Sequence, residues 1–213
     1  MYKVKCFDKI AKCGLDKLGN GYVFTDDIAE ADVALVRSSS LHEIDAGENL
    51  FAVARAGAGV NNIPVDKFAQ KGIVVFNTPG ANANGVKELV IAALLLSSRD
   101  VIDGVNWVRT IEGDVGKAVE KGKKAFAGKE IAGKKLGVIG LGAIGALVCN
   151  IGLDLGMDVY GYDPYLSVDA ALRLDRHVHV VKDVNELYKV SDYVTIHVPY
   201  TSSTKDFING DAI

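Results

Sequence analysis

The feature that most constrains the fold of this chain is the glycine-rich segment GLGAIG, residues 140–145. It follows a short apolar run and opens a stretch, residues 144–155, whose apolar residues recur at helical spacing. The next strand-like run, residues 157–162, ends at Asp163. A G-x-G-x-x-G segment between two strands, with an acid at the end of the second strand, is typical of a dinucleotide-binding unit. The sequence therefore predicts such a unit over residues 136–163.

The three glycines are expected to have different tasks. Gly140 permits a tight turn, Gly142 lets a pyrophosphate approach the backbone, and Gly145 lets the helix pack closely on the strand. The helix that begins here would present free N–H groups and the positive end of its dipole to the phosphates.

Asp163 is expected to choose the cofactor. A carboxylate at this position accepts a hydrogen bond from the ribose 2′-hydroxyl and repels a 2′-phosphate, which predicts NAD rather than NADP. The alternative is that Asp163 only caps a turn before Pro164.

Residues 1–80 alternate short β-rich runs with helical or turn segments, a pattern that predicts a parallel sheet. The runs are continuous in hydrophobicity, as in strands buried on both faces; they lie at residues 4–7, 22–24, 33–36, 51–54 and 73–76. The segment 77–85 is rich in Asn, Gly and Pro and predicts a hinge. The helix-favouring segment 86–98 is apolar nearly all round, so we expect a buried helix there, between two domains. A second helix should follow, with Val101, Val105 and Val108 on one face.

Charge and hydropathy exclude several classes of protein. The formal net charge of −3 argues against nucleic-acid binding. The stretch from Lys117 to Lys135 contains seven lysines and is interpreted as a solvated loop.

Other features bear on location and metal binding. No apolar run approaches the roughly 20 residues of a membrane span. The strand-like start favours a cytoplasmic protein, and three widely spaced cysteines predict reduced thiols. His177 and His179 could share a strand face but have no third ligand, so no metal site is expected.

Several segments resemble the D-2-hydroxyacid dehydrogenase family in their order and spacing, along nearly the whole chain. They are VRS (36–38), RAGAGVNN (55–62), FNTPGANAN (76–84), FAGKEIAGK (126–134), the glycine segment, GYDP (161–164) and HVPYT (197–201) with Thr204. The likeness is greatest to the members that act on 3-phosphoglycerate. It implies hydride transfer between this acid and NAD, giving 3-phosphohydroxypyruvate at the start of serine biosynthesis.

The resemblance also implies a domain organisation. The fold class is α/β with two doubly wound parallel-sheet domains: a flavodoxin-like substrate-binding domain over residues 1–80 and an incomplete Rossmann NAD-binding domain over residues 81–213. The partner is a small-molecule substrate, without nucleic acid or membrane, and the full-length protein is expected to be a homodimer.

Site residues follow from the motifs and the resemblance together. The expected substrate-binding residues are Arg37, Ser38, Arg55, Gly57 and Ala58, because arginines suit phosphate or carboxylate and the 56–60 loop offers backbone N–H groups. The expected cofactor-binding residues are Gly140, Gly142, Ala143, Ile144, Gly145, Asp163, His197, Val198, Pro199 and Thr204. The resemblance places His197 in the cofactor wall rather than in the role of a general base. For the two arginines, ordinary surface ion pairs remain the alternative.

The family's catalytic arginine, glutamate and histidine lie beyond the strand that ends in His-Val-Pro, and the sequence stops at Ile213 before them. We therefore expect a fragment that binds without turning over. Two other functions remain open: a dehydrogenase of another 2-hydroxy acid such as glycerate, and an NADH-sensing binding protein like a transcriptional corepressor.

Overall fold

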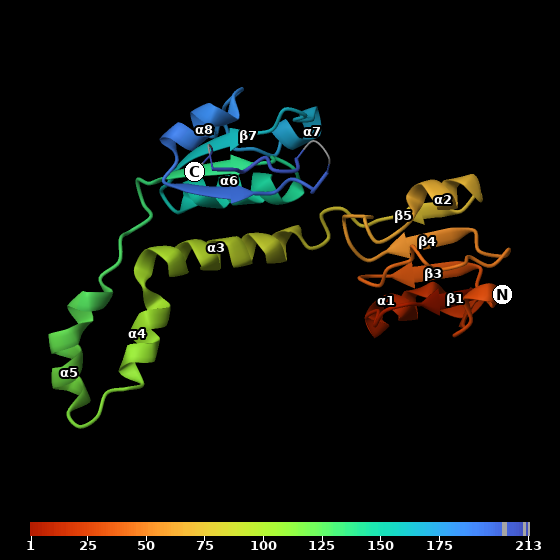
Figure 1. The fold of residues 1–213 in the computed structure, drawn as a ribbon, viewed down its shortest axis with the longest axis horizontal. Helices are drawn as coiled ribbons and strands as arrows, with labels where there is room; N and C mark the ends of the chain where they lie inside the picture. The colour runs from red at the N-terminus through yellow and green to blue at the C-terminus, as the bar shows by residue number, and fades with distance from the viewer. Residues whose placement is uncertain (202–203, 211, 213) are drawn as a thin grey trace. The chain divides into compact units, whose positions relative to one another are not determined.

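In the computed structural model the chain divides into two compact units, Met1–Asn82 and Ala83–Ile213 (Figure 1). The structure describes residues 1–201, 204–210 and 212. Each unit holds a parallel sheet with helices against it, which confirms the predicted α/β class.

The first unit is a five-stranded parallel sheet in the order β2-β1-β3-β4-β5. Its strands are β1 (Tyr2–Cys6), β2 (Tyr22–Phe24), β3 (Val33–Val36), β4 (Ala52–Arg55) and β5 (Val74–Phe76). They are joined through α1 (Lys12–Leu15), η1 (Asp16–Gly21), η2 (Ile28–Glu30) and α2 (Val65–Gln70). This is the flavodoxin-like strand order, in which ligands bind at the carboxyl ends of the strands.

Burial in this sheet is uneven. Phe68 of α2 is fully buried in a cluster with Val36 and Val53. The expectation that all strands are buried on both faces was wrong, since Val74 and Phe76 of β5 are 53% and 57% exposed. The reason is topological, because β2 and β5 are the edge strands of the sheet and each has one strand neighbour.

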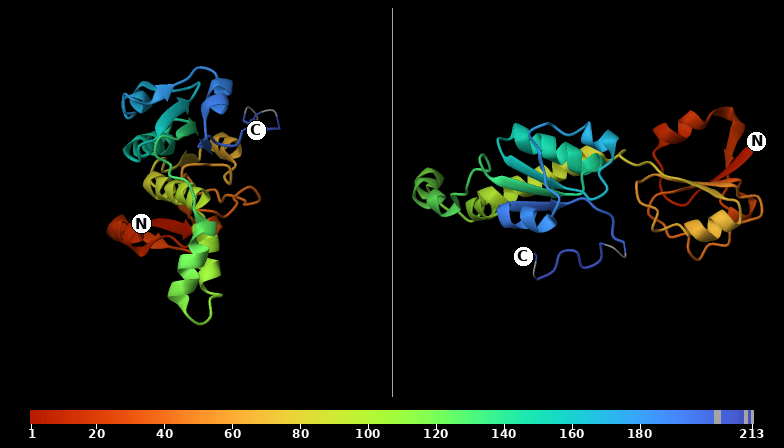
Figure 2. Two further views of the ribbon diagram at one scale, coloured as in Figure 1. Left: turned by 90° about the vertical axis from the view of Figure 1, so that its left-hand side faces the viewer. Right: turned by 90° about the horizontal axis from the view of Figure 1, so that it is seen from above.

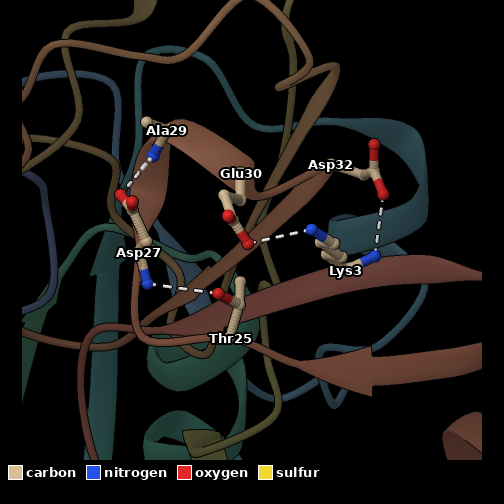
Figure 3. Close-up of polar contacts among 6 residues, drawn as sticks. All are labelled: Lys3, Thr25, Asp27, Ala29, Glu30 and Asp32. Atoms are coloured by element: carbon tan, nitrogen blue, oxygen red, sulfur yellow. Dashed lines mark hydrogen bonds and ion pairs between the residues drawn. The ribbon is translucent and has the colours of Figure 1, made fainter.

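Polar contacts fasten the turn after β2 to the sheet (Figure 3). The backbone N–H of Lys3 donates to the Asp32 carboxylate at 2.7 Å, and the Lys3 ammonium pairs with Glu30 at 2.8 Å. The Asp27 side chain caps η2 by accepting the N–H of Ala29 at 2.9 Å. A β1 residue thus holds both η2 and the start of β3.

The second unit is a parallel sheet in the order β8-β7-β6-β9. Its strands are β6 (Lys135–Ile139), β7 (Asp158–Tyr162), β8 (His179–Val180) and β9 (Tyr193–Ile196), and its helices include α6 (Ala143–Asp154), α7 (Val168–Ala171) and α8 (Val184–Val190). Figure 1 shows α6 and α8 on opposite sides of the sheet. Residues 136–139 of β6 are therefore fully buried, as the predicted two-sided burial requires.

The long helix α3 (Ala83–Arg99) packs along α6. Ser98 near its end is buried, with its hydroxyl 3.0 Å from the Tyr193 hydroxyl on β9. The expectation of burial all round was wrong, because Leu89 is 72% exposed. Only Ala83, Leu94 and Ser98 are buried among the residues of this helix.

A helical arm follows α3, comprising α4 (Val101–Val108), α5 (Val115–Gly122) and η3 (Lys123–Phe126); Figure 2 shows it from two further directions. The predicted second helix is α4. The interpretation of the lysine-rich stretch as a loop was wrong over α5 and η3. Helix α5 forms because Asp114 accepts the N–H of Lys117 at 3.1 Å and caps it. The rings of Trp107 and Phe126 close the arm at a centroid distance of 4.9 Å.

Candidate functional site

The glycine turn lies where three strands of the second unit end. Gly140 has a φ of 89°, and its N–H donates to the Tyr162 carbonyl of β7 at 2.8 Å. A side chain at this position would come within 2.7 Å of the His197 carbonyl oxygen, beyond β9. Both the left-handed backbone and the close approach of β9 require glycine here.

The other two glycines of the motif differ from each other. A Cβ at Gly145 would overlap the carbonyl oxygen of Gly140, so helix α6 and the turn are in direct backbone contact. Gly142 has a φ of −71°, and a Cβ there would meet no atom within 4 Å. Nothing within the described chain therefore demands glycine at 142, and the space above it is open to a ligand.

Helix α6 begins at this open position without a side-chain cap. The N–H groups of its first turn have no partner within the helix and project outward beyond its N-terminal end. Ala143 is exposed there, and Ile144 is half-buried against the hydrophobic core. The turn thus offers N–H donors without a partner among the described residues, and a positive dipole end, beside Gly142.

A pocket of about 660 Å³ borders this turn. It is lined by Ile139, Gly140, Gly142, Tyr162, Asp163, Pro164, Tyr165, His197, Val198, Pro199, Thr201, Thr204 and Phe207. Seven of the ten predicted cofactor residues line it, while Ala143, Ile144 and Gly145 lie at the adjoining start of α6.

The pocket also has an aromatic side that the sequence reasoning missed. The rings of Tyr162 and Phe207 are nearly parallel, with centroids 6.4 Å apart and an interplanar angle of 18°. Tyr165 belongs to the same lining and is 87% exposed. Two tyrosines flanking Asp163 in the sequence were the available signal, because flat apolar rings suit a planar base.

Both carboxylate oxygens of Asp163 accept backbone hydrogen bonds. One accepts the N–H of Leu141 in the glycine turn at 2.9 Å, and the other accepts the N–H of Tyr165 at 2.9 Å. Each carboxylate oxygen has room to accept a further hydrogen bond, so ligand binding and turn capping are compatible at this residue.

His197 is built into the wall of the pocket. Its backbone N–H donates to the Ile139 carbonyl at 2.7 Å, and its ring Nε2 lies 3.0 Å from the Thr195 hydroxyl. Burial lowers the pKa of the imidazole, so the ring is neutral at pH 7. Beyond it, the Thr204 hydroxyl donates to the Pro199 carbonyl at 2.6 Å and accepts the N–H of Thr201 at 2.8 Å.

A second cluster lies at the carboxyl ends of β3 and β4 in the first unit. Arg55 donates from Nε to the Arg37 carbonyl at 3.1 Å and from a terminal nitrogen to the Gly59 carbonyl. The Asn77 amide donates to the Ala58 carbonyl at 2.7 Å. These bonds fix the 56–60 loop.

A pocket of about 320 Å³ borders this loop, lined by Arg37, Ala56, Gly57, Thr78, Ala81 and Asn82. Of the predicted substrate residues, Arg37 and Gly57 line it, whereas Ser38, Arg55 and Ala58 do not. Arg55 is committed to backbone carbonyls, and the N–H of Ser38 donates to Asp8 at 3.0 Å. Within residues 1–201, 204–210 and 212, neither the Arg37 guanidinium nor the Ala58 N–H has a partner.

His177 and His179 do not form the pair on one strand face that the sequence suggested. His179 lies on β8 and stacks on Tyr160 with ring centroids 5.0 Å apart. His177 lies before β8, with its Nδ1 2.7 Å from Asp175, so the prediction of a shared face was wrong. Across the described residues there is no group of three or more His, Cys, Asp or Glu placed to hold a metal. In that same part of the chain no helix has the length and hydropathy to cross a membrane.

Comparison with known proteins agrees with this geometry. Residues 91–213 match the family model described as "D-isomer specific 2-hydroxyacid dehydrogenase, NAD binding domain". The chain is 38% identical over 191 residues to D-3-phosphoglycerate dehydrogenase of Methanocaldococcus jannaschii, covering 88% of this chain and 34% of that relative. It is 42% identical over 189 residues to hydroxypyruvate reductase of Thermotoga maritima, covering 87% of this chain and 57% of that relative.

A solved structure extends the likeness to the whole chain. The structure of NAD⁺-bound 3-phosphoglycerate dehydrogenase from Entamoeba histolytica matches with a TM-score of 0.73 and 29% identity, covering 100% of this chain and 67% of that one. The chain thus spans about a third to three fifths of the two curated relatives. The family model and the NAD⁺-bound structure together confirm the predicted family and the predicted cofactor, NAD. The chain belongs to the D-isomer specific 2-hydroxyacid dehydrogenase family, and its second unit contains that family's NAD-binding domain.

Proposed function

We propose that the protein is an NAD-dependent oxidoreductase of a small D-2-hydroxy acid. The second unit would hold NAD, and the first unit would hold the acid. The observation that carries the proposal is the bond between Asp163 and the glycine turn, which places a carboxylate acceptor beside the open position at Gly142. These are the groups that a ribose and a pyrophosphate require.

The residues present account for binding and orientation. NAD, when bound, accepts or supplies the hydride at its nicotinamide ring. The first turn of α6 would bind the pyrophosphate, and Asp163 would accept the ribose hydroxyls. His197 would form part of the cofactor wall and would not act as a base, because a half-buried imidazole whose Nε2 lies 3.0 Å from the Thr195 hydroxyl is poorly placed to take a proton from substrate. We therefore assign no catalytic proton transfer to the described residues of this pocket.

We propose 3-phosphoglycerate as the substrate, oxidised to 3-phosphohydroxypyruvate in the first step of serine biosynthesis. The Arg37 guanidinium, which has no partner among the described residues, supplies a cation at the first unit's pocket, and the N–H of Ala58, likewise without a partner there, supplies a neighbouring donor. The name of the Methanocaldococcus relative supports this choice.

A second candidate is hydroxypyruvate or glycerate. Arg55 is held by the carbonyls of Arg37 and Gly59, so Arg37 is the one arginine in the pocket's lining. A single cation is enough for a substrate that carries only a carboxylate. The name of the Thermotoga relative, hydroxypyruvate reductase, supports this alternative.

Binding measurements test both levels of the proposal. Fluorescence titration should show tighter binding of NADH than of NADPH, and failure to bind either dinucleotide would refute the cofactor assignment. Calorimetric titration with D-3-phosphoglycerate and D-glycerate should favour the phosphorylated acid by about tenfold or more, as one additional charge-assisted contact predicts. Equal affinities would support the second candidate.

We also propose that the protein is a cytoplasmic homodimer. The arm helix α4 carries Val101, Val105 and Val108 at helical spacing, and each is 45–47% exposed. Such a stripe is suited to a second copy of the same helix, because apolar faces of this kind are usually buried between subunits. The cysteines are all unpaired, as is usual in a reducing compartment. Analytical ultracentrifugation would distinguish dimer from monomer.

A further inference from the structure

A single carboxylate organises the turn that carries Arg37. Asp8, just beyond β1, accepts the backbone N–H of Arg37 at 2.6 Å and that of Ser38 at 3.0 Å. It also accepts the N–H of Ser39 at 3.2 Å and its hydroxyl at 2.9 Å. Three successive N–H groups that converge on one anion form a backbone nest, and here the anion is part of the protein.

This arrangement fixes the backbone of Arg37 from both sides. Its N–H is bound by Asp8, and its carbonyl accepts the Nε–H of Arg55 at 3.1 Å. The guanidinium has no partner of its own in the described part of the chain, and Arg37 lines the pocket with Gly57 and Thr78. The main chain is therefore held while the side chain stays available.

The turn is linked to the neighbouring loop as well. The Asn62 amide donates to the Ser39 carbonyl at 2.8 Å, and the N–H of Leu41 donates to the Asn62 carbonyl at 2.8 Å. Asn62 belongs to the segment that continues the 56–60 loop. Asp8 thus orders one of two connected loops at the carboxyl edge of the sheet.

We propose that Asp8 is a positioning residue for the acid substrate, acting through Arg37. It is absent from the pocket lining, so its influence on a ligand passes through the turn it binds. The inference rests on the proposed function, because it takes Arg37 as the residue that contacts the acid's anionic group.

The carboxylate form matters for this role. A carboxylate only accepts, whereas an amide in its place would turn its NH2 group, a donor, toward the donors of the nest. Partial burial opposes the charge of Asp8, but the hydrogen bonds from residues 37–39 outweigh it and lower the pKa. Asp8 is therefore ionised throughout the neutral range.

A double-mutant cycle tests the proposal on the whole chain, with D-3-phosphoglycerate as the calorimetric probe. We expect Asp8→Asn and Arg37→Lys each to weaken binding on the order of tenfold. Asp8→Asn should add little to Arg37→Lys, because both act on one guanidinium. NADH affinity, which belongs to the other unit, should stay at the wild-type value in all variants.

The matched control is Asp32→Asn. Asp32 is a second carboxylate of the same unit that accepts a backbone N–H, that of Lys3 at 2.7 Å, and it does not line the pocket (Figure 3). The Asp32→Asn variant should be less stable than the wild type and keep wild-type affinity for D-3-phosphoglycerate. If Asp8→Asn does not fold, Ser39→Ala removes the hydroxyl, which donates to Asp8 at 2.9 Å and lies 3.3 Å from the Phe7 carbonyl, and it should give a smaller loss of affinity in the same direction.

The outcomes separate the two proposals. Fully additive losses, or equal losses for Asp8→Asn and Asp32→Asn, would overturn the positioning role and leave the substrate site intact. Wild-type affinity in Arg37→Lys and in Arg37→Ala would overturn the proposed substrate site and the positioning role with it.

Discussion

The carboxylate of Asp163 is bonded to the backbone N–H of Leu141 at 2.9 Å, so the acid at the end of β7 is part of the glycine turn at the end of β6. The two interpretations of Asp163 from the sequence, ribose acceptor and turn cap, are therefore not exclusive. The other carboxylate oxygen accepts the N–H of Tyr165 at 2.9 Å and caps the turn at Pro164, so the bond to Leu141 and the turn cap use different oxygens of a residue that lines the pocket.

Substituting Asp163 should change cofactor preference. In Asp163→Ala we expect the ratio of NADH to NADPH affinity to fall by about ten- to a hundredfold, because a charged acceptor is lost and repulsion of the 2′-phosphate disappears. Fluorescence titration with both dinucleotides measures the ratio. An unchanged ratio with a lower melting temperature would mean that Asp163 only caps the turn.

The same substitution should affect two glycines of the turn differently, by weakening NADH binding at one and lowering stability at the other. Gly142→Ala should fold normally, because the added methyl enters only open space. It should bind NADH about tenfold more weakly, because that space is where the pyrophosphate is expected to lie. Gly145→Ala should be destabilised by about 1–3 kcal/mol, because its methyl overlaps the Gly140 carbonyl. Thermal unfolding and NADH titration of both variants check this pair, and a similar loss of stability in both would contradict it.

The buried thiol of Cys149 should make stability fall in alkali. Burial raises its pKa from 9.0 to about 12, so the folded state keeps a proton that the unfolded chain releases. The contribution of the protonated thiol to the free energy of unfolding is complete below pH 9. It is lost as the pH rises toward 12, by roughly 4 kcal/mol in all.

Urea unfolding at pH 7.5, 9 and 10.5 measures this effect. The variant Cys149→Ala should start less stable and lose less with rising pH than the wild type. Parallel losses in the two proteins would show that other groups cause the decline. In the native protein, exposed Cys13 should react with a thiol reagent long before Cys149 does.

A charge on the arm should disrupt self-association. Val105→Glu places a carboxylate on the exposed stripe of α4 and should shift the protein toward monomer in analytical ultracentrifugation, with NADH affinity unchanged. Leu172→Glu is the matched control, because Leu172 is an apolar residue 79% exposed outside the arm. Equal behaviour of both variants would exclude α4 from the interface.

Much of the secondary structure could be predicted because its signals are local. The runs at residues 22–24 and 33–36 coincide with β2 and β3, and the glycine segment falls at the start of α6 as expected. Burial could not be predicted so well. The apolar runs of β5 and β6 look alike in the sequence, but β5 is an edge strand and β6 lies between α6 and α8.

The sequence by itself determined the parallel α/β class and the position of the dinucleotide turn, because glycine spacing and apolar periodicity act over a few neighbouring residues. It indicated the family through the resemblance of several motifs in their order and spacing. Only the tertiary structure decided how the candidate residues are used. It committed Arg55 to backbone carbonyls, left the Arg37 guanidinium without a partner among the described residues and joined Asp8 to a turn 29–31 residues away. Such assignments depend on which strand ends meet at one edge of a sheet, and no local pattern in the chain carries that information.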